Sequence, residues 1–169
     1  MIVLPVLAIG LAYLDATELE ATVAKLYQVI SGPAGQKRDW EAFRALFAPE
    51  AKMRVVVTRD AKSRVVILSP DDYVTRSGPR LEQDGFFERE SKRTAVVYGD
   101  LAHVWSSYEA RMKADDAQPF MRGVNSLQLA KVDGAWKILS IVWTSEQDAG
   151  APPPSANEAN RTSRQGVRP

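Results

Sequence analysis

Apolar residues in the first half of the chain recur at helical spacing. From residue 15 to residue 30 one helix face carries Leu19, Val23, Leu26, Tyr27 and Ile30. This period predicts an amphipathic helix of about four turns, which Ser31-Gly32-Pro33 ends. A second, shorter helix is predicted to begin at Asp39, a candidate N-cap, and to end before Pro49. Its apolar face carries Trp40, Phe43, Leu46 and Phe47.

A third helix is predicted after a short strand. Three consecutive valines at 55–57 are typical of a strand. Ser69-Pro70-Asp71-Asp72 then places a capping side chain directly before a proline, which is a common way for a helix to begin. We therefore expect three helices in the N-terminal part of the chain.

Beyond residue 85 the pattern changes from helical spacing to alternation. Strand-forming stretches cover 86–98, 102–114 and 120–145, and the last is long enough for two strands. Asp133-Gly134 inside that stretch is typical of a two-residue hairpin turn. Helices followed by four strands predict an α+β fold in which the helices pack on one face of an antiparallel sheet.

The Asp133-Gly134 turn also sets a register for the last hairpin. Val132 then pairs with Ala135, and regular pairing places Leu129 opposite Ile138. One face carries Gly123, Asn125, Leu127, Leu129, Trp136, Ile138 and Val142, and the other carries Arg122, Val124, Ser126, Gln128, Leu139, Ile141 and Trp143. Because the second face is too apolar for plain solvent, we expect a second subunit to cover it.

The two ends of the chain differ in composition from its middle. Residues 1–14 hold no charged side chain, and this stretch is too short for a membrane-spanning helix. It fits the apolar region of a secretory signal but lacks the basic start, so either an exported or a cytoplasmic protein is consistent with it. Residues 148–169 are rich in Pro, Ser, Asn and Arg, which predicts a disordered tail. The domain itself is expected over 15–147.

Composition excludes several kinds of chemistry. The 169 residues include no cysteine and one histidine, so zinc–thiolate, disulfide and multi-histidine metal sites are excluded. A formal net charge of +1 gives no electrostatic footprint for nucleic acid. No phosphate-binding glycine loop, dinucleotide fingerprint or serine-hydrolase elbow occurs. We therefore predict neither a cofactor nor a metal ion.

Four stretches of the sequence carry a family resemblance, which covers about residues 16–146. They are "RDWEAFRALFAPEA" (38–51), "FFERE" (86–90), "GDLAHVWSSYEAR" (99–111) and "RGVNSLQLAKVDGAWKILSIVWTSE" (122–146). The residues of these stretches and the order of helices and strands resemble those of small bacterial members of the nuclear transport factor 2-like superfamily, also called SnoaL-like or cystatin-like. The resemblance implies a cone with a pocket between the helices and the concave sheet face, and dimers formed through the sheet. Its members include isomerases, dehydratases, cyclases, binding proteins and dimers without activity, so fold alone does not select a function.

The resemblance directs attention to carboxylates, tyrosines and histidine. Ketosteroid-isomerase relatives use a carboxylate base with a Tyr hydroxyl, for which Tyr108, Asp39, Glu88 and Glu90 are the available groups. Tyr108 is the candidate catalytic residue, with a core position as its alternative. Asp39 is more simply a helix cap, and basic neighbours make Glu88 and Glu90 more simply a solvated ion-paired face. Dehydratase relatives use more than one pocket histidine, whereas His103 is alone and falls on the face opposite Tyr108.

Candidate ligand-binding residues are Asn125, Tyr108, Trp40 and Arg122. Asn125 falls on the expected pocket face, where its amide can donate and accept, and a buried amide bonded to backbone is the alternative. Arg122 nominally points to the other face, toward Glu109 or Glu146, unless a bulge reverses it.

Three functions stay open from the sequence. The first is a binding or accessory domain with a largely apolar pocket for a small hydrophobic ligand. The second is a cofactor-free lyase or isomerase that acts on a hydrophobic carbonyl compound. The third is a dimerisation module without a ligand. A raised carboxylate pKa inside a sealed pocket would favour the enzyme.

Overall fold

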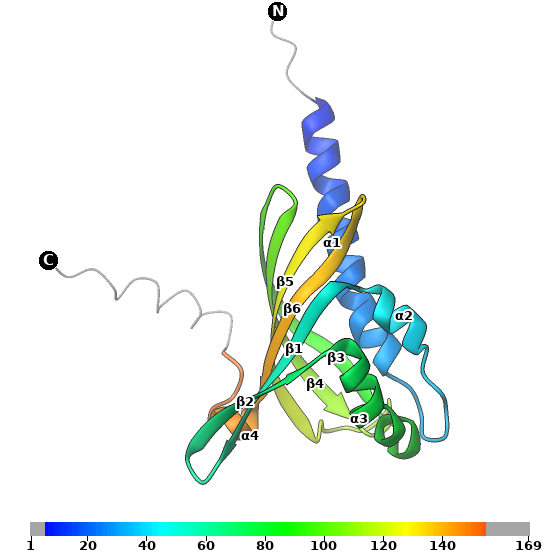
Figure 1. Ribbon diagram of the computed structural model, residues 1–169, viewed down its shortest axis with the longest axis vertical. Coiled ribbons are helices and arrows are strands. Elements are labelled where there is room, and N and C mark those ends of the chain that lie inside the picture. The colour runs from blue at the N-terminus through cyan, green and yellow to red at the C-terminus, as the bar shows by residue number, and fades with distance from the viewer. Residues whose placement is uncertain (1–5, 155–169) are drawn as a thin grey trace, which may run out of the picture.

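The computed structural model describes residues 6–154. Its elements in chain order are α1 (Val6–Ile30), α2 (Trp40–Ala45), β1 (Phe47–Arg59), β2 (Lys62–Leu68), α3 (Pro70–Asp84), β3 (Phe87–Tyr98), β4 (Leu101–Arg111), β5 (Met121–Val132), β6 (Ala135–Ser145) and α4 (Glu146–Ala149). Helices α1, α2 and α3 lie on one side of a strongly curved sheet, as the α+β prediction expects (Figure 1).

The six strands form one sheet in the order β2-β1-β6-β5-β4-β3. Every neighbouring pair is antiparallel except β1 and β6, which run parallel. The sheet is therefore mixed, and the expectation of a wholly antiparallel sheet is wrong at this one junction. No hairpin joins β1 to β6, because most of the domain separates them in sequence, so nothing local forces them to be antiparallel.

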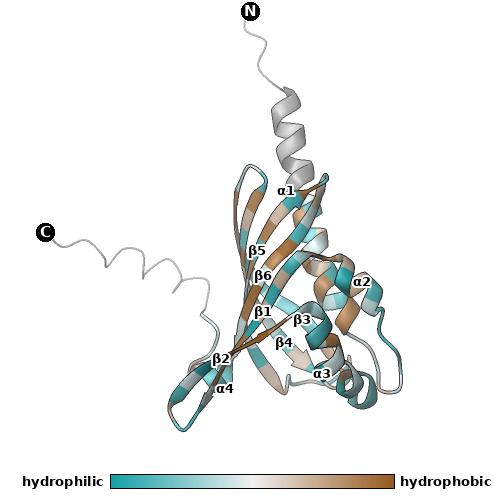
Figure 2. Cartoon of the chain, in the orientation of Figure 1, coloured by the Kyte–Doolittle hydropathy of each residue, from teal (hydrophilic) through white to brown (hydrophobic). Residues whose placement is uncertain are grey.

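Strand β2 was not predicted, and the strand expected at 55–57 is longer. Asp60 and Ala61 have positive φ angles of 51° and 58° and turn β1 back into β2. Alanine is uncommon in this left-handed conformation, so the dipeptide gave no hairpin signal. β2 is hydrophobic along much of its length although it forms a sheet edge (Figure 2).

Helix α1 begins earlier than the capping residues predicted. It runs from Val6 through Asp15 and Thr17 without a break, so most of the apolar segment 1–14 is helical. The N-terminal part of α1 extends past the end of the sheet (Figure 1). Cleavage of this segment stays a prediction, and residues 1–5 lie outside the described residues. No helix among residues 6–154 is both long and apolar enough to cross a membrane.

The starts of α2 and α3 follow the capping signals. Asp39 accepts a hydrogen bond from the backbone of Ala42 at 2.9 Å. Ser69 and Asp72 form a reciprocal capping box around Pro70 at the start of α3. These local contacts fix the residues at which α2 and α3 begin.

The hairpin register holds near its turn and changes farther away. Val132 pairs with Ala135 and Leu129 with Ile138, as predicted, but Gln128 pairs with Ser140, so Leu139 is an extra, bulged residue on β6. Beyond it Asn125 pairs with Trp143 rather than Val142. Ile138 and Ile141 are both buried, an odd spacing that regular alternation cannot produce. The bulge therefore turns Ile141 and Trp143 toward the helices and Val142 away from them.

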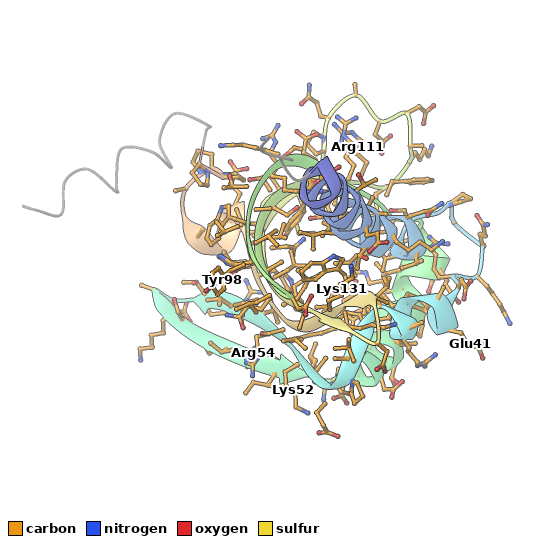
Figure 3. All side chains as sticks on the ribbon, turned by 90° about the horizontal axis from the view of Figure 1, so that it is seen from above. Glu41, Lys52, Arg54, Tyr98, Arg111 and Lys131 are labelled. Carbon is orange, nitrogen blue, oxygen red and sulfur yellow. The ribbon has the colours of Figure 1, made fainter. Side chains whose placement is uncertain are left out.

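Buried apolar residues fill the space between α1, α2 and the concave sheet face. The largest fully enclosed ones are Phe43, Leu127, Leu129, Ile138, Val23 and Val104. Seen from above, the strands curve around the space beside α1, while Lys52 and Arg54 lie on the outer side of β1 (Figure 3). The core thus occupies one face of the sheet.

The segment from residue 148 begins in folded structure. Asp148 lies in α4 and accepts a hydrogen bond from the Thr58 backbone N–H at 2.8 Å. Ser145 is the N-cap of α4, and its Oγ accepts from the Asp148 backbone N–H. Pro154 accepts a hydrogen bond from Lys92 at 3.4 Å. The rest of the predicted disordered tail, residues 155–169, lies outside the described residues.

Candidate functional site

The core is not filled completely between the helices and the sheet. A cavity of about 220 Å³ lies there, with mostly apolar walls that include Leu26, Ile30, Phe43, Met53 and Ile141. Four larger polar side chains also line it, namely Tyr73, Glu88, Tyr108 and Asn125. They come from α3, β3, β4 and β5, so the fold assembles one polar group from each of four elements.

Glu88 is the carboxyl group of this cavity. It lies near the start of β3 opposite Ala110, and both side chains therefore share the inward face of the sheet. Desolvation by burial raises the pKa of Glu88 to about 8, and an Asn125 N–H at 3.5 Å opposes this only weakly. The carboxyl group is therefore mostly protonated at neutral pH and can exchange a proton near it.

Asn125 joins the cavity to a buried polar network. Its Nδ2 donates to Tyr27 Oη at 3.0 Å, and the residue is only 5% exposed. The Tyr27 hydroxyl lies 2.6 Å from Ser106 Oγ, also fully buried. The Asn125 amide is thus held by side chains, whereas the alternative interpretation from the sequence was a buried amide bonded to backbone.

Tyr108 is packed against a glycine that its ring requires. It pairs across the strands with Gly123, where an added Cβ would lie 2.4 Å from Tyr108 Oη. Burial and the nearby Glu88 raise the pKa of Tyr108, so its hydroxyl keeps its proton. Among the described residues this hydroxyl forms no hydrogen bond, which leaves it available to a ligand.

Tyr73 completes the polar groups from the helical side. Its ring stacks on Phe43 with centroids 5.3 Å apart and meets Trp143 edge-on at 6.4 Å. Burial raises the pKa of Tyr73 as well, with Glu88 as the second cause. The cavity therefore combines an aromatic wall with protonated hydroxyl groups.

Comparison with solved structures identifies the fold of this chain. No family model matches the sequence, and no curated protein does either. Among solved structures, a nuclear transport factor 2-like protein with a cystatin-like fold from Novosphingobium aromaticivorans aligns with a TM-score of 0.66 and 17% identity, covering 95% of this chain and 97% of its own. The chain has the nuclear transport factor 2-like fold.

Other proteins that share the nuclear transport factor 2-like fold differ in their described roles. The beta subunit of a proposed aromatic-ring-hydroxylating dioxygenase from Novosphingobium aromaticivorans aligns at a TM-score of 0.60 and 13% identity, covering 80% of this chain and 91% of its own. A proposed dehydratase from Streptomyces avermitilis aligns at 0.56 and 14%, covering 79% and 96%. Identities this low show the fold alone, so the function must be argued from the site.

Of the four predicted ligand-binding residues, the nuclear transport factor 2-like fold brings two to the cavity, Tyr108 and Asn125. Trp40 does not line it: its Nε1 donates to Glu82 at 2.8 Å and its ring packs beside Gly78. Arg122 points to the outer face, where its Nε lies 3.7 Å from Glu109 Oε1. Alternation along the strand predicted this face.

The expectation of a solvated ion-paired face is wrong for Glu88. For Glu90 the ion pair is present, with Arg93, but it is part-buried rather than solvated. Glu88 lines the cavity, and Glu90 is part-buried and bonded to Arg93 and Ser106. Alternation from the buried Phe86 would have placed both carboxyls inward, but the basic neighbours suggested the surface. Burial of two carboxyls on a core face is rare enough that sequence reasoning favoured the wrong side.

His103 lies on the outer face, where its Nε2 is 3.0 Å from Ser126 Oγ. It is therefore remote from the cavity of this nuclear transport factor 2-like fold, as predicted from its alternation with Tyr108. No cluster of three or more His, Asp or Glu side chains suited to a metal ion occurs within residues 6–154.

Proposed function

We propose that this domain binds a small, mostly apolar molecule in the cavity and holds one polar group of that molecule at the cavity wall. The observation that carries the proposal is the convergence of Tyr73, Glu88, Tyr108 and Asn125 in an otherwise apolar space. Apolar walls with a few converging polar groups are the usual design of a small-molecule site.

The size and shape of the cavity indicate the class of ligand. Its volume of about 220 Å³ is below the range of roughly 300–1,000 Å³ that holds drug-sized ligands, so a molecule of one or two rings is favoured. Tyr73, Phe43 and Trp143 supply aromatic surfaces that suit a flat, apolar body.

The proposal is tested by calorimetry with 2-naphthol, a flat probe that carries a single hydroxyl. Binding to the full chain is expected, together with a rise in thermal midpoint. Ile141→Phe, which extends a side chain into the cavity, should abolish binding. Leu139→Phe, on the outer side of the same strand, is the matched control and should leave it intact. Equal binding by both variants would place the ligand elsewhere.

A second candidate function is cofactor-free proton transfer on a hydrophobic carbonyl compound. The observation that favours it is Glu88, whose pKa of about 8 suits a group that takes and returns a proton near neutral pH. In this mechanism the Glu88 carboxylate removes a proton beside the carbonyl, and the protonated Tyr108 hydroxyl donates to the resulting oxyanion.

Exchange of the α-protons of 2-tetralone in deuterated water, followed by NMR, tests this candidate. The wild-type protein should accelerate exchange, Glu88→Gln should abolish the acceleration, and Tyr108→Phe should lower it at least about tenfold. A wild-type rate equal to that of buffer would remove the catalytic candidate and leave the binding proposal standing.

We also propose that a second copy of the chain packs on the outer sheet face. Val65, Ile67, Val96 and Trp105 are apolar, and each is between 42% and 65% exposed. Strand pairing places all four on the outer side: Val65 and Ile67 on β2, Trp105 on β4, and Val96 on β3. Apolar side chains spread over several strands of one face support an interface rather than a solvated surface.

A further inference from the structure

A chain of hydrogen bonds runs behind the cavity wall from Asn125 to an ion pair. Asn125 Nδ2 lies 3.0 Å from Tyr27 Oη, which lies 2.6 Å from Ser106 Oγ. Ser106 Oγ donates to Glu90 Oε1. Arg93 holds Glu90 through Nε at 3.0 and 2.9 Å and through Nη2 at 2.6 Å. Tyr27, Ser106 and Asn125 are all at least nine-tenths buried.

The ion pair gives this chain a single direction. Glu90 is a carboxylate bound by Arg93, so it can only accept, and Ser106 must donate to it. A hydroxyl has one hydrogen, so Ser106 can then only accept from Tyr27, and Tyr27 must donate. The Tyr27 oxygen is left to accept, so Asn125 must present its amino group there. The orientation of the amide thus follows from a charge three links away.

This orientation determines what Asn125 shows to the cavity. One N–H goes to Tyr27 and the other points toward Glu88 Oε1 at 3.5 Å. The Oδ1 atom has no hydrogen bond within residues 6–154, and it is not among their fully enclosed unpaired atoms, which are Arg111 Nη1 and Trp136 Nε1. Asn125 lines the cavity, so this oxygen is the polar group that the residue has left to offer there.

We propose that Tyr27 and Ser106 are positioning residues that orient the Asn125 amide, so that the cavity offers a carbonyl acceptor and selects ligands carrying an O–H or N–H donor. This inference rests on the proposed ligand binding and narrows its ligand class. The donor group sits beside Tyr108, whose free hydroxyl meets an acceptor on the same ligand. Enols, phenols, carboxylic acids and primary amides on an apolar body fit this pattern.

Removing one link of this hydrogen-bond series should allow the Asn125 amide to turn over. In Ser106→Ala the Tyr27 hydroxyl loses its acceptor, and a half-turn of the Asn125 amide supplies a new one in Oδ1. The amino group of Asn125 then faces the cavity, and Glu88 loses its N–H donor. The cavity now offers a donor where it offered an acceptor, and the preferred ligand changes accordingly.

A pair of matched probes measures the change. The wild-type chain should bind 2-naphthol at least about fivefold more tightly than 2-methoxynaphthalene, because the ether leaves Asn125 Oδ1 unpaired. Ser106→Ala and Tyr27→Phe should each remove this preference, and the double variant should remove no more than either single change. Ser107→Ala replaces the next serine of the strand, which is buried but takes no part in these hydrogen bonds, and it should keep the preference for 2-naphthol. A preference unchanged in Ser106→Ala overturns the inference.

A second measurement needs no ligand. The Asn125 N–H lowers the pKa of Glu88, so NMR titration of Glu88 should give a higher pKa in Ser106→Ala than in the wild type and in Ser107→Ala. If neither naphthalene binds the wild-type protein, the proposed function fails, and this titration still decides the inference. An unchanged Glu88 titration in both Ser106→Ala and Tyr27→Phe would show that the amide does not turn.

Discussion

The buried carboxyl group of Glu88 makes the stability of the folded state depend on pH. Burial raises its pKa from 4.5 to about 8, so the folded state holds a proton that the unfolded chain releases. Stability from this group is therefore complete below about pH 4.5 and is lost as the pH rises through about 8.

The first prediction concerns Glu88→Gln. Urea unfolding at a series of pH values should show wild-type stability falling between pH 5 and 8, by at most about 5 kcal/mol. The Gln variant cannot ionise, so its stability should change much less over this interval. Parallel pH profiles for the two proteins would contradict the burial of a protonated Glu88.

The second prediction concerns the contact between Gly123 and Tyr108. Gly123→Ala would place a Cβ 2.3 Å from the Thr144 carbonyl oxygen and 2.4 Å from Tyr108 Oη, and the backbone oxygen cannot move aside. We expect a loss of about 2–4 kcal/mol in urea unfolding. Gly78→Ala is the control, because its added Cβ meets only the Trp40 ring at 3.2 Å. Similar losses in both variants would argue against a specific requirement at Gly123.

At the scale of elements, local signals were sufficient where one contact decides the structure. The caps at Asp39 and Ser69 and the Asp133-Gly134 turn were read correctly, because each depends on residues three or fewer positions apart. The β6 bulge, the Asp60-Ala61 turn and the inward Glu88 were missed. Each of these depends on what the rest of the domain packs against that segment, and no short pattern in the sequence contains that information.

The third prediction tests the β6 bulge as an inserted residue. Leu139 is the unpaired position between Ile138 and Ser140, so its deletion keeps both Ile138 and Ile141 inward by plain alternation. This deletion should cost less than about 2 kcal/mol in urea unfolding. Deletion of Lys137 in the regular part of the strand turns Trp136 outward and should cost at least about twice as much. The reverse order of stability would show that the bulge is not the extra residue.

At the scale of the whole molecule, the outer sheet face sets the fourth prediction. Trp105 is 42% exposed on this face and lines a groove of about 330 Å³ together with Val124, Val142 and Pro152. Sedimentation of the wild-type chain should show a dimer, and Trp105→Glu should shift it to monomer by burying an unpaired charge. Gln83→Glu, an exposed position on α3, makes the same change of charge away from this face and is the control, which should stay dimeric. A monomeric wild-type chain, or a dimer that survives Trp105→Glu, would contradict the proposed interface.

The parallel pairing of β1 with β6 also bears on how the chain is made. Strand β6, the last of the sheet to leave the ribosome, lies between β1 and β5. Until residue 145 has emerged, no strand pairing joins β1 and β2 to the three strands β3 to β5. Before that point, the nascent chain holds two separate parts of the sheet, and its apolar core is incomplete. Completion of the domain is a single late event, in which the final strand closes the middle of the sheet rather than its edge.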